Sequence, residues 1–457
     1  MHLMNLIRET SPVLRDRSMM ETKLKRIAEK AKVDKKCKFT SLMQLVNKEV
    51  LAQCHKELVG NKAAGISGIT KETYGLELEA NINNLVNRMK MMSYKPQMVK
   101  RVYIPKNGSD KKRPLGIPEY EDKLVQKAMT KILNAIYEQD FLDSSFGFRP
   151  GRGQHDALKI LHVYLERRDI NFVVDADIKG FFDNVSHDWM MQFLSHRISD
   201  PKFLRTITRF LKAGYLEEGK KYNTDKGTPQ GGVISPVLAN IYLHYVLDLW
   251  FDKYSKSCRG QVYMVRYADD FVCCFEYQDE AVQFYDALKE RLMKFSLEIA
   301  EDKTTILPFG RRQKEYRIPG EKRTFDFLGF THFCSKGMKR QFRVKRKMSL
   351  KKKTAKLKAI KEWIVHNRTL DVKLLMKKLN QKLQGLYNYY CITDSSESMQ
   401  SFYMMVRRLL FKWLNRRSQR KSFTWAKFLL FLERYPIVEP KVKVSIYELR
   451  PEISYIL

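Results

Sequence analysis

Residues 265–272 of this 457-residue chain read Val-Arg-Tyr-Ala-Asp-Asp-Phe-Val, and the fold is organised around this stretch. Apolar, β-prone runs lie on both sides of a short polar step, over residues 261–267 and 271–275, which predicts a tight β-hairpin. The step carries two adjacent carboxylates, Asp269 and Asp270, which repel each other unless a cation lies between them. Ionised groups against an apolar sheet must be paired or bound to a metal. The stretch therefore indicates a divalent-metal site with hard oxygen ligands, and a plain surface turn is the alternative.

A second acidic stretch, residues 172–178, reads Phe-Val-Val-Asp-Ala-Asp-Ile and predicts a strand. Side chains alternate between the two faces of a strand, so Asp175 and Asp177 share a face. Carboxylates within a strand that otherwise reads as buried are costly without a function. If this strand lies beside the hairpin, Asp177, Asp269 and Asp270 converge, which is what two-metal phosphoryl transfer requires.

The composition indicates a polyanionic partner. Hydrophobic residues make up 44% of the chain, enough for large cores, while the formal net charge of +34 cannot be neutralised internally. No apolar run is long enough to span a bilayer, and the apolar core of the N-terminus is too short for a signal peptide. The seven cysteines show no Cys-x-x-Cys spacing, so we expect a reducing cytoplasm, no disulfide framework and no structural zinc.

Two motifs carry a resemblance to a known family. Tyr267-Ala268-Asp269-Asp270 resembles the catalytic box of reverse transcriptases, and residues 177–183 resemble their other metal-binding box. The sequence is most similar to group II intron-encoded reverse transcriptase/maturases of bacteria and organelles, over residues 39–417. The resemblance implies an α+β right-hand polymerase with fingers, palm and thumb, an N-terminal extension and an α-helical thumb/maturase domain. It also implies two Mg²⁺ ions, or Mn²⁺ in their place, held by three residues that are both catalytic and metal ligands: Asp177, Asp269 and Asp270.

The resemblance also implies a nucleotide site. Family residues that match Lys106 and Arg113 hold the incoming triphosphate, and a lysine charge and a bidentate arginine suit phosphate oxygens. The turn between them is one residue longer than the usual pattern, so Lys111 or Lys112 could share the role. The plainer alternatives are an exposed basic hairpin for Lys106 and Arg113, a core position for Phe182 and a turn position for Lys303. The resemblance further places Phe182 under the nucleotide sugar, Gln230 beside the nucleotide and Lys303 near the leaving pyrophosphate.

Basic residues predict the nucleic-acid surface. Residues 145–152, Ser-Phe-Gly-Phe-Arg-Pro-Gly-Arg, lie near the template strand if the resemblance holds. From residue 336 onward the chain becomes densely basic, with helices expected over 350–365, 371–389 and 398–415. An apolar stripe of Leu374, Leu379, Leu383 and Leu386 favours a packed bundle with one basic side. The predicted RNA- or DNA-binding residues are Arg149, Arg152, Lys339, Arg340, Arg343, Lys345, Arg346, Lys347, Lys351 and Lys352.

We expect five segments along the chain. They are a basic N-terminal extension (1–38), the extension box and fingers (39–170), the palm (171–335), the helical thumb/maturase domain (336–415) and a basic C-terminal region (416–457) that could be a reduced DNA-binding domain. Within the second segment, Thr40 is predicted to cap a helix that runs to about residue 58. We find no His-Asn-His pattern with paired cysteines, and so expect no endonuclease domain.

The expected function is RNA-directed DNA synthesis by a protein that binds structured group II intron RNA and assists splicing and retrohoming. The implied partners are intron RNA, RNA/DNA duplexes and deoxynucleoside triphosphates, but no membrane, and a homodimer is left open. The implied location is the bacterial cytoplasm, with nucleoid association when the protein is on DNA. Two alternatives stay open: a non-catalytic RNA-binding splicing factor, and a free-standing or defence-associated reverse transcriptase of the same origin.

Overall fold

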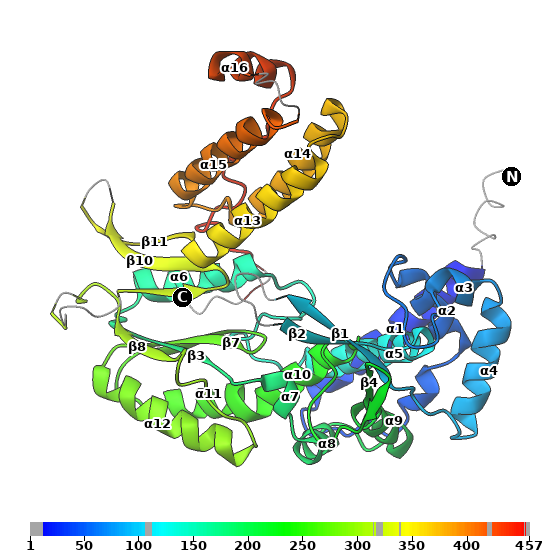
Figure 1. The fold of residues 1–457 in the computed structure, drawn as a ribbon. Coiled ribbons are helices and arrows are strands. Elements are labelled where there is room, and N and C mark those ends of the chain that lie inside the picture. Colours follow the sequence, from blue (N-terminus) through cyan, green and yellow to red (C-terminus); the bar gives the residue numbers. More distant parts are fainter. Residues whose placement is uncertain are drawn as a thin grey trace, which may run out of the picture.

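The computed structural model describes residues 12–105, 112–313, 315–316, 323–337, 340–417, 423–451 and 453, with residues 12–19 as backbone only. Lys106, Lys111 and Lys339, which the sequence singles out, lie outside these residues. The described chain is a mixed α+β structure in which a helical C-terminal region stands above a larger body of sheets and helices (Figure 1). This arrangement confirms the α+β class and the helical C-terminal region predicted from the sequence.

A four-stranded antiparallel sheet in the order β6-β7-β3-β8 lies at the centre of the larger body. The predicted hairpin and its neighbouring strand are confirmed, because β7 pairs with both β6 and β3. The register sets Asp177 directly opposite Asp270. The four strands are β3 (Phe172–Asp177), β6 (Val262–Tyr267), β7 (Asp270–Phe275) and β8 (Thr305–Pro308).

Apolar side chains cover both faces of this sheet. On one face Val174, Phe271 and Cys273 share a core with Phe284 of α12 (Gln278–Lys294) and with α10 (Ser235–Leu243). On the other face Val173, Val272 and Cys274 share a second core with α6 (Gln154–Arg167) and with the C-terminal region. Because both faces are packed over most of their length, the carboxylates are accessible only near the end of β3 and at the β6–β7 turn.

A helical layer and a second sheet lie beside the central sheet (Figure 1). The second sheet has the order β2-β1-β4-β5, and its β1–β2 hairpin is the predicted basic hairpin. Its strands are β1 (Val99–Pro105), β2 (Lys112–Ile117), β4 (Tyr215–Glu217) and β5 (Lys220–Tyr222). The helices are α1 (Pro12–Val33), α2 (Lys48–Glu57), α3 (Lys71–Gly75), α4 (Leu78–Lys90), α5 (Tyr120–Tyr137), α7 (Phe181–Asn184), α8 (His187–Ser195), α9 (Pro201–Leu211) and α11 (Leu249–Ser255).

The predicted helix from Thr40 begins later than expected. Residues Met43–Leu45 form a separate 3₁₀ turn, whose Met43 N–H donates to Asp200 at 2.8 Å. Asn47 then caps α2, since its side chain accepts from the Val50 N–H at 3.0 Å. Thr40 is therefore not the cap; Asn47 satisfies the free N–H groups of the first turn instead.

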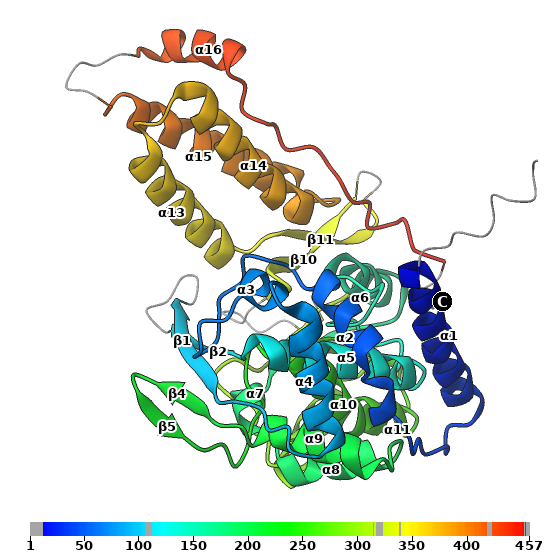
Figure 2. The ribbon, with the colours of Figure 1, turned by 90° about the vertical axis from the view of Figure 1, so that its right-hand side faces the viewer.

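The C-terminal region starts with the sheet β11-β10-β9 and continues as helices. The three predicted helices are confirmed, but the apolar stripe of α14 runs through Leu375, Leu379, Leu383 and Tyr387, whereas Leu374 is 41% exposed. After α16 the chain returns along the bundle, and Val444 bridges to Ile392 (Figure 2). The elements are β9 (Thr324–Phe327), β10 (Phe330–Lys336), β11 (Phe342–Met348), α13 (Leu350–Asn367), α14 (Val372–Tyr390), α15 (Ser396–Leu414) and α16 (Trp425–Arg434).

Two expectations drawn from composition can be compared with the structure. All seven cysteines are free thiols in the structure. Each helix in the described ranges is too short or too polar to cross a bilayer.

Candidate active site

Four carboxylates from two neighbouring strands and one turn line a single cavity of about 1060 Å³. Asp175 and Asp177 come from β3, Asp270 is the first residue of β7, and Asp269 lies in the β6–β7 turn. Ala268, which opens this turn, has a φ of 60°, a left-handed conformation that permits the tight reversal at some cost in strain. The structure thus brings Asp177, Asp269 and Asp270 together, as the sequence predicted, although they lie about ninety residues apart in the chain.

The four carboxylates repel one another. Burial, together with the charges of Asp175, Asp269 and Asp177, raises the pKa of Asp270 to about 7. Burial also raises the pKa of Asp269, with a contribution from Asp177. The Lys303 ammonium pairs with Asp177 Oδ2, and this hydrogen bond raises the pKa of Lys303. The cavity therefore favours a cation at its acidic floor, and one lysine already supplies part of that charge.

The donor set fits Mg²⁺. Carboxylate oxygens are the ligands that hard divalent ions prefer, and Mg²⁺ in nucleotide sites usually takes one or two carboxylates together with phosphate oxygens and water. Within the described residues no three His, Cys, Asp or Glu side chains are grouped so that they could hold one metal ion by themselves. Nucleotide phosphates and water would therefore have to complete the coordination around Asp177, Asp269 and Asp270.

The metal-free protein is expected to melt at a higher temperature at pH 6 than at pH 8. Folding raises the pKa of Asp270 from 3.8 to about 7, so between these values the folded state holds a proton that the unfolded chain has lost. Stability is therefore gained as the pH falls through about 7. Melting followed by circular dichroism measures this, and Asp270→Asn should remove part of the pH dependence. Asp122→Asn should remove a further part of it, because burial also raises the pKa of Asp122 to about 7, away from the cavity. An unchanged profile in Asp270→Asn would contradict the account.

The predicted nucleotide-binding residues that the structure describes lie in two adjoining cavities. Arg113 lines the carboxylate cavity, and its Nε donates to Gln230 Oε1 at 2.9 Å. Gln230 and Phe182 line a neighbouring cavity of about 500 Å³. Phe182 is 8% exposed and packs edge-on against Phe181, with ring centroids 5.3 Å apart. The Arg113–Gln230 hydrogen bond therefore links the acidic cavity to the cavity that contains Phe182.

The wall opposite the carboxylates is basic and aromatic. Lys351 and Lys352 of α13, both predicted to bind nucleic acid, line the carboxylate cavity. So do Lys356 and Lys382, which are not among the predicted residues, together with Trp363 and Tyr389. Lys356 follows Lys352 by one helical turn, a spacing that could have identified it. Lys382 Nζ lies 5.4 Å from the Trp363 ring centroid, a cation–π contact between α14 and α13 that no sequence pattern reveals.

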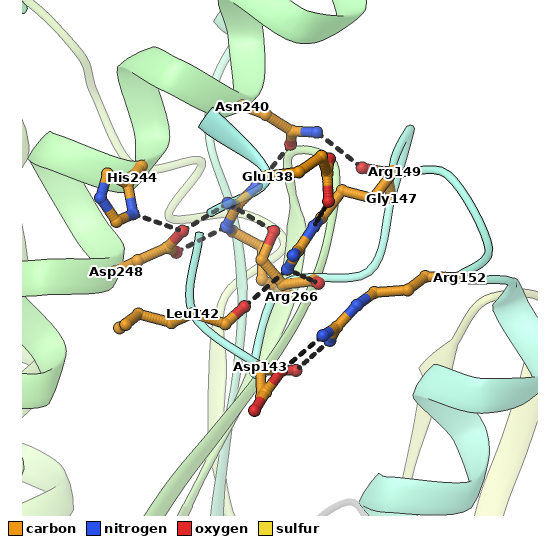
Figure 3. A network of polar contacts seen from close by, with 11 residues as sticks. Glu138, Leu142, Asp143, Gly147, Arg149, Arg152, Asn240, His244, Asp248 and Arg266 are labelled. Atoms are coloured by element: carbon orange, nitrogen blue, oxygen red, sulfur yellow. Dashed lines mark hydrogen bonds and ion pairs between the residues drawn. The ribbon is translucent and has the colours of Figure 1, made fainter. Parts of the chain in front are cut away.

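Three predicted nucleic-acid contacts are corrected by the structure. Arg149 is buried, and it binds Glu138 Oε2 at 3.0 Å and the Leu142 carbonyl at 2.7 Å (Figure 3). Arg152 is paired with Asp143, and its side chain is largely covered. Arg346 is completely buried and donates to His162 Nδ1 at 2.9 Å. All three guanidiniums hold protein segments together, and burial leaves those of Arg149 and Arg346 no free face for a phosphate.

The remaining basic candidates lie around the β10–β11 hairpin. Arg343 pairs with Glu166 at 3.3 Å and also contacts Tyr447. Lys347 is exposed, and its Nζ lies 5.3 Å from the Phe333 ring centroid. Arg340 is exposed in a turn, and Lys345 is half-buried on β11. Their contact with RNA or DNA stays a prediction.

Comparison with known proteins identifies the class. Residues 104–332 match the model of the reverse transcriptase (RNA-dependent DNA polymerase) family, and residues 350–429 match the group II intron maturase-specific domain. The group II intron-encoded protein LtrA of Lactococcus lactis subsp. cremoris is 31% identical over 445 residues, which cover 80% of this chain and 73% of that protein. Protein YkfC of Escherichia coli K12 is 34% identical over 238 residues, 50% of this chain and 61% of that protein. The putative COX1/OXI3 intron 2 protein of Saccharomyces cerevisiae is 33% identical over 189 residues, 41% and 21% of the two chains.

The match of residues 104–332 shows that this enzyme is a reverse transcriptase. With the maturase-specific domain and the similarity to LtrA, the chain belongs to the group II intron-encoded reverse transcriptase/maturase family. The family implies RNA-directed DNA polymerase activity and binding of intron RNA, and reverse transcriptases generally use divalent metal ions.

Proposed function

We propose that this chain copies RNA into DNA by two-metal nucleotidyl transfer, with Asp177, Asp269 and Asp270 as the ligands of two Mg²⁺ ions. The observation that carries the proposal is the in-register pairing of Asp177 with Asp270 at the floor of a cavity whose opposite wall is basic. The proposal describes a right-hand polymerase. The sheet β6-β7-β3-β8 would be the palm, the N-terminal helices with β1–β2 the fingers, and α13–α15 the thumb.

Each residue has a defined part in this proposal. When bound, the two ions would lower the pKa of the primer 3′-hydroxyl and neutralise charge on the triphosphate. The three carboxylates fix where these charges sit, and Arg113, with Lys106 outside the described residues, holds phosphate oxygens. Lys303, whose ammonium pairs with Asp177, would give a proton to the departing pyrophosphate.

Primer extension tests the proposal directly. The purified protein is given a DNA primer annealed to an RNA template or to a DNA template of the same sequence, with deoxynucleoside triphosphates and Mg²⁺. Extension on the RNA template, lost in EDTA and restored by Mg²⁺ or Mn²⁺, is expected. Extension that persists in EDTA, or that occurs on the DNA template alone, would overturn the proposal.

Phe182→Ala is expected to raise ribonucleotide incorporation about 10- to 200-fold relative to deoxynucleotide incorporation. The Phe182 ring lines the same cavity as Gln230, and without the ring a 2′-hydroxyl would meet no steric barrier. A small group that does not fit a pocket changes selectivity by about 10- to 200-fold. The ratio of kcat/KM for the two nucleotides measures the effect. Phe182→Tyr and Phe181→Leu are the controls, and both should keep the wild-type ratio. An unchanged ratio in Phe182→Ala would assign the ring to the core alone.

A second function, assistance in intron splicing and retrohoming, is favoured by the match of residues 350–429 to the maturase-specific domain. In this proposal α13–α15 bind structured intron RNA on the basic side of the bundle. Splicing of the cognate intron by an Asp269→Asn variant separates this function from DNA synthesis. If the Asp269→Asn variant splices the intron at the wild-type rate without DNA synthesis, the two functions are separable. If the wild-type protein does not stimulate splicing, a free-standing or defence-associated reverse transcriptase is favoured.

A further inference from the structure

We propose that Arg266 is a positioning residue for the turn that carries Asp269 and Asp270, and that Asp248 holds its guanidinium in place. This inference rests on the proposed role of the two aspartates in DNA synthesis. Arg266 lies on β6, three residues before Asp269, and is completely buried. A buried guanidinium is costly unless all its donors are paired.

Every N–H of the Arg266 guanidinium has an acceptor. Nε and Nη2 bind the two oxygens of Asp248 at 2.7 and 2.5 Å, a bidentate pair from the end of the π-helical turn η2 (His244–Asp248) (Figure 3). Nη2 also donates to Ser145 Oγ at 2.8 Å. Nη1 donates to Asn240 Oδ1 at 3.1 Å and to the Ala268 carbonyl at 2.9 Å. Four of these bonds fix the guanidinium, and the fifth reaches the turn.

The bond to the Ala268 carbonyl acts directly on the turn. Ala268 has a φ of 60°, a conformation that a non-glycine residue adopts only when its surroundings impose it. The Ala268 carbonyl belongs to the same rigid peptide plane as the Asp269 N–H. Holding that carbonyl therefore sets the orientation of the backbone from which the Asp269 side chain projects.

The segment around Gly147 closes the turn from the other side. A Cβ at Gly147 would lie 2.2 Å from the Ala268 nitrogen, so only glycine permits this approach. Asn240 Nδ2 donates to the Gly147 carbonyl at 2.7 Å while its Oδ1 accepts from Arg266. The backbone of Arg266 also pairs with this segment, since the Phe146 N–H donates to its carbonyl at 2.9 Å. Arg266 and Asn240 therefore join the α10–η2 helix, the segment around Gly147 and the turn into one clamp.

Lysine cannot replace this arginine, because an ammonium is a point charge without the planar fork that reaches Asp248, Asn240 and Ala268 together. We test Arg266→Lys and Asp248→Asn, with Ser145→Ala as a milder variant that removes one of the five bonds. Asp140→Asn is the matched control: it breaks the largely buried Arg197–Asp140 pair, which is 3.0 Å long and shares no contact with Arg266. The measurements are kcat and KM for the deoxynucleotide, hydrogen exchange of the peptide spanning residues 265–272, and the melting temperature.

Arg266→Lys and Asp248→Asn should lower kcat by at least about tenfold with KM changed less than about twofold, because a misplaced reacting group costs rate more than binding. Amide exchange over residues 265–272 should become faster in Arg266→Lys and Asp248→Asn. Ser145→Ala should show the same changes to a smaller degree, and it provides the test if the other two variants fail to fold. Asp140→Asn should lower only the melting temperature.

Two results would overturn the positioning role. One is unchanged exchange over residues 265–272 in Ser145→Ala and in every folded variant at Arg266 or Asp248. The other is a wild-type kcat in Arg266→Lys when the Asp269/Asp270 double variant has lost synthesis. That pair of results would contradict the positioning role of Arg266 but would leave the proposed function standing. Retained synthesis in the double variant would instead overturn the proposed function, and the exchange data would still report on the clamp.

Discussion

Replacement of both Asp269 and Asp270 by asparagine is expected to abolish DNA synthesis, with a fall in rate of about a thousandfold or more. The two side chains line the floor of the cavity with Asp177, and asparagine keeps their size while it removes the charge that holds a divalent ion. Metal ions contribute several kcal/mol to phosphoryl-transfer transition states, and each 1.4 kcal/mol is about a factor of ten in rate. Primer extension on an RNA template under single-turnover conditions measures the loss.

RNA affinity and folding should survive the same double substitution. The basic wall of Lys351, Lys352 and Lys356 is untouched, and removing buried, mutually repelling carboxylates should raise the melting temperature at pH 8. A matched control replaces two exposed aspartates, Asp252 and Asp279, by asparagine, which should leave synthesis at the wild-type rate. Synthesis by the Asp269/Asp270 variant at more than about a hundredth of the wild-type rate would contradict the assignment of these residues.

Affinity for RNA is expected to fall about 10³- to 10⁵-fold between 50 and 200 mM salt, as for a protein that contacts six to ten phosphates. The net charge of +34 and the lysines on the wall of the active-site cavity supply these contacts. Filter binding or fluorescence anisotropy over a salt series gives the slope of log K against log salt.

The lysines responsible can be tested one by one. Lys351→Gln, Lys352→Gln and Lys356→Gln should each reduce the magnitude of the salt slope by about one and weaken binding to all sequences alike. The control variants Lys253→Gln and Lys294→Gln change exposed lysines on α11 and α12, beneath the central sheet (Figure 1), and should leave the slope unchanged. A slope near zero for the wild-type protein would contradict the basic surface as an RNA-binding site.

The sequence is informative where the signal is local. The β6–β7 hairpin follows from two apolar, β-prone runs on either side of a short polar step, and strand β3 follows from a third apolar run. The two adjacent carboxylates mark the turn between β6 and β7. That Asp177 lies opposite Asp270 could be expected only through the resemblance to reverse transcriptases, since pairing between distant strands leaves no local signal.

Buried arginines account for most of what the sequence could not predict. Arg149 and Arg346 look like surface charges in a basic chain, yet each is buried because distant groups, Glu138 and His162, accept its hydrogen bonds. Arg266 gives no signal in the sequence for the same reason, since its partner Asp248 lies on a helix whose sequence pattern is that of plain core. Partners of this kind become visible only when the chain is folded.

Anomalous diffraction from Mn²⁺ is the most direct test of the claim that three aspartates hold the ions of a polymerase. Crystals of the protein with an RNA template, a DNA primer lacking its 3′-hydroxyl and the matching deoxynucleoside triphosphate would be grown with Mn²⁺. We predict two anomalous peaks within ligand distance of the carboxylates of Asp177, Asp269 and Asp270, beside the triphosphate. Manganese bound elsewhere, with these three side chains turned away from it, would contradict the account.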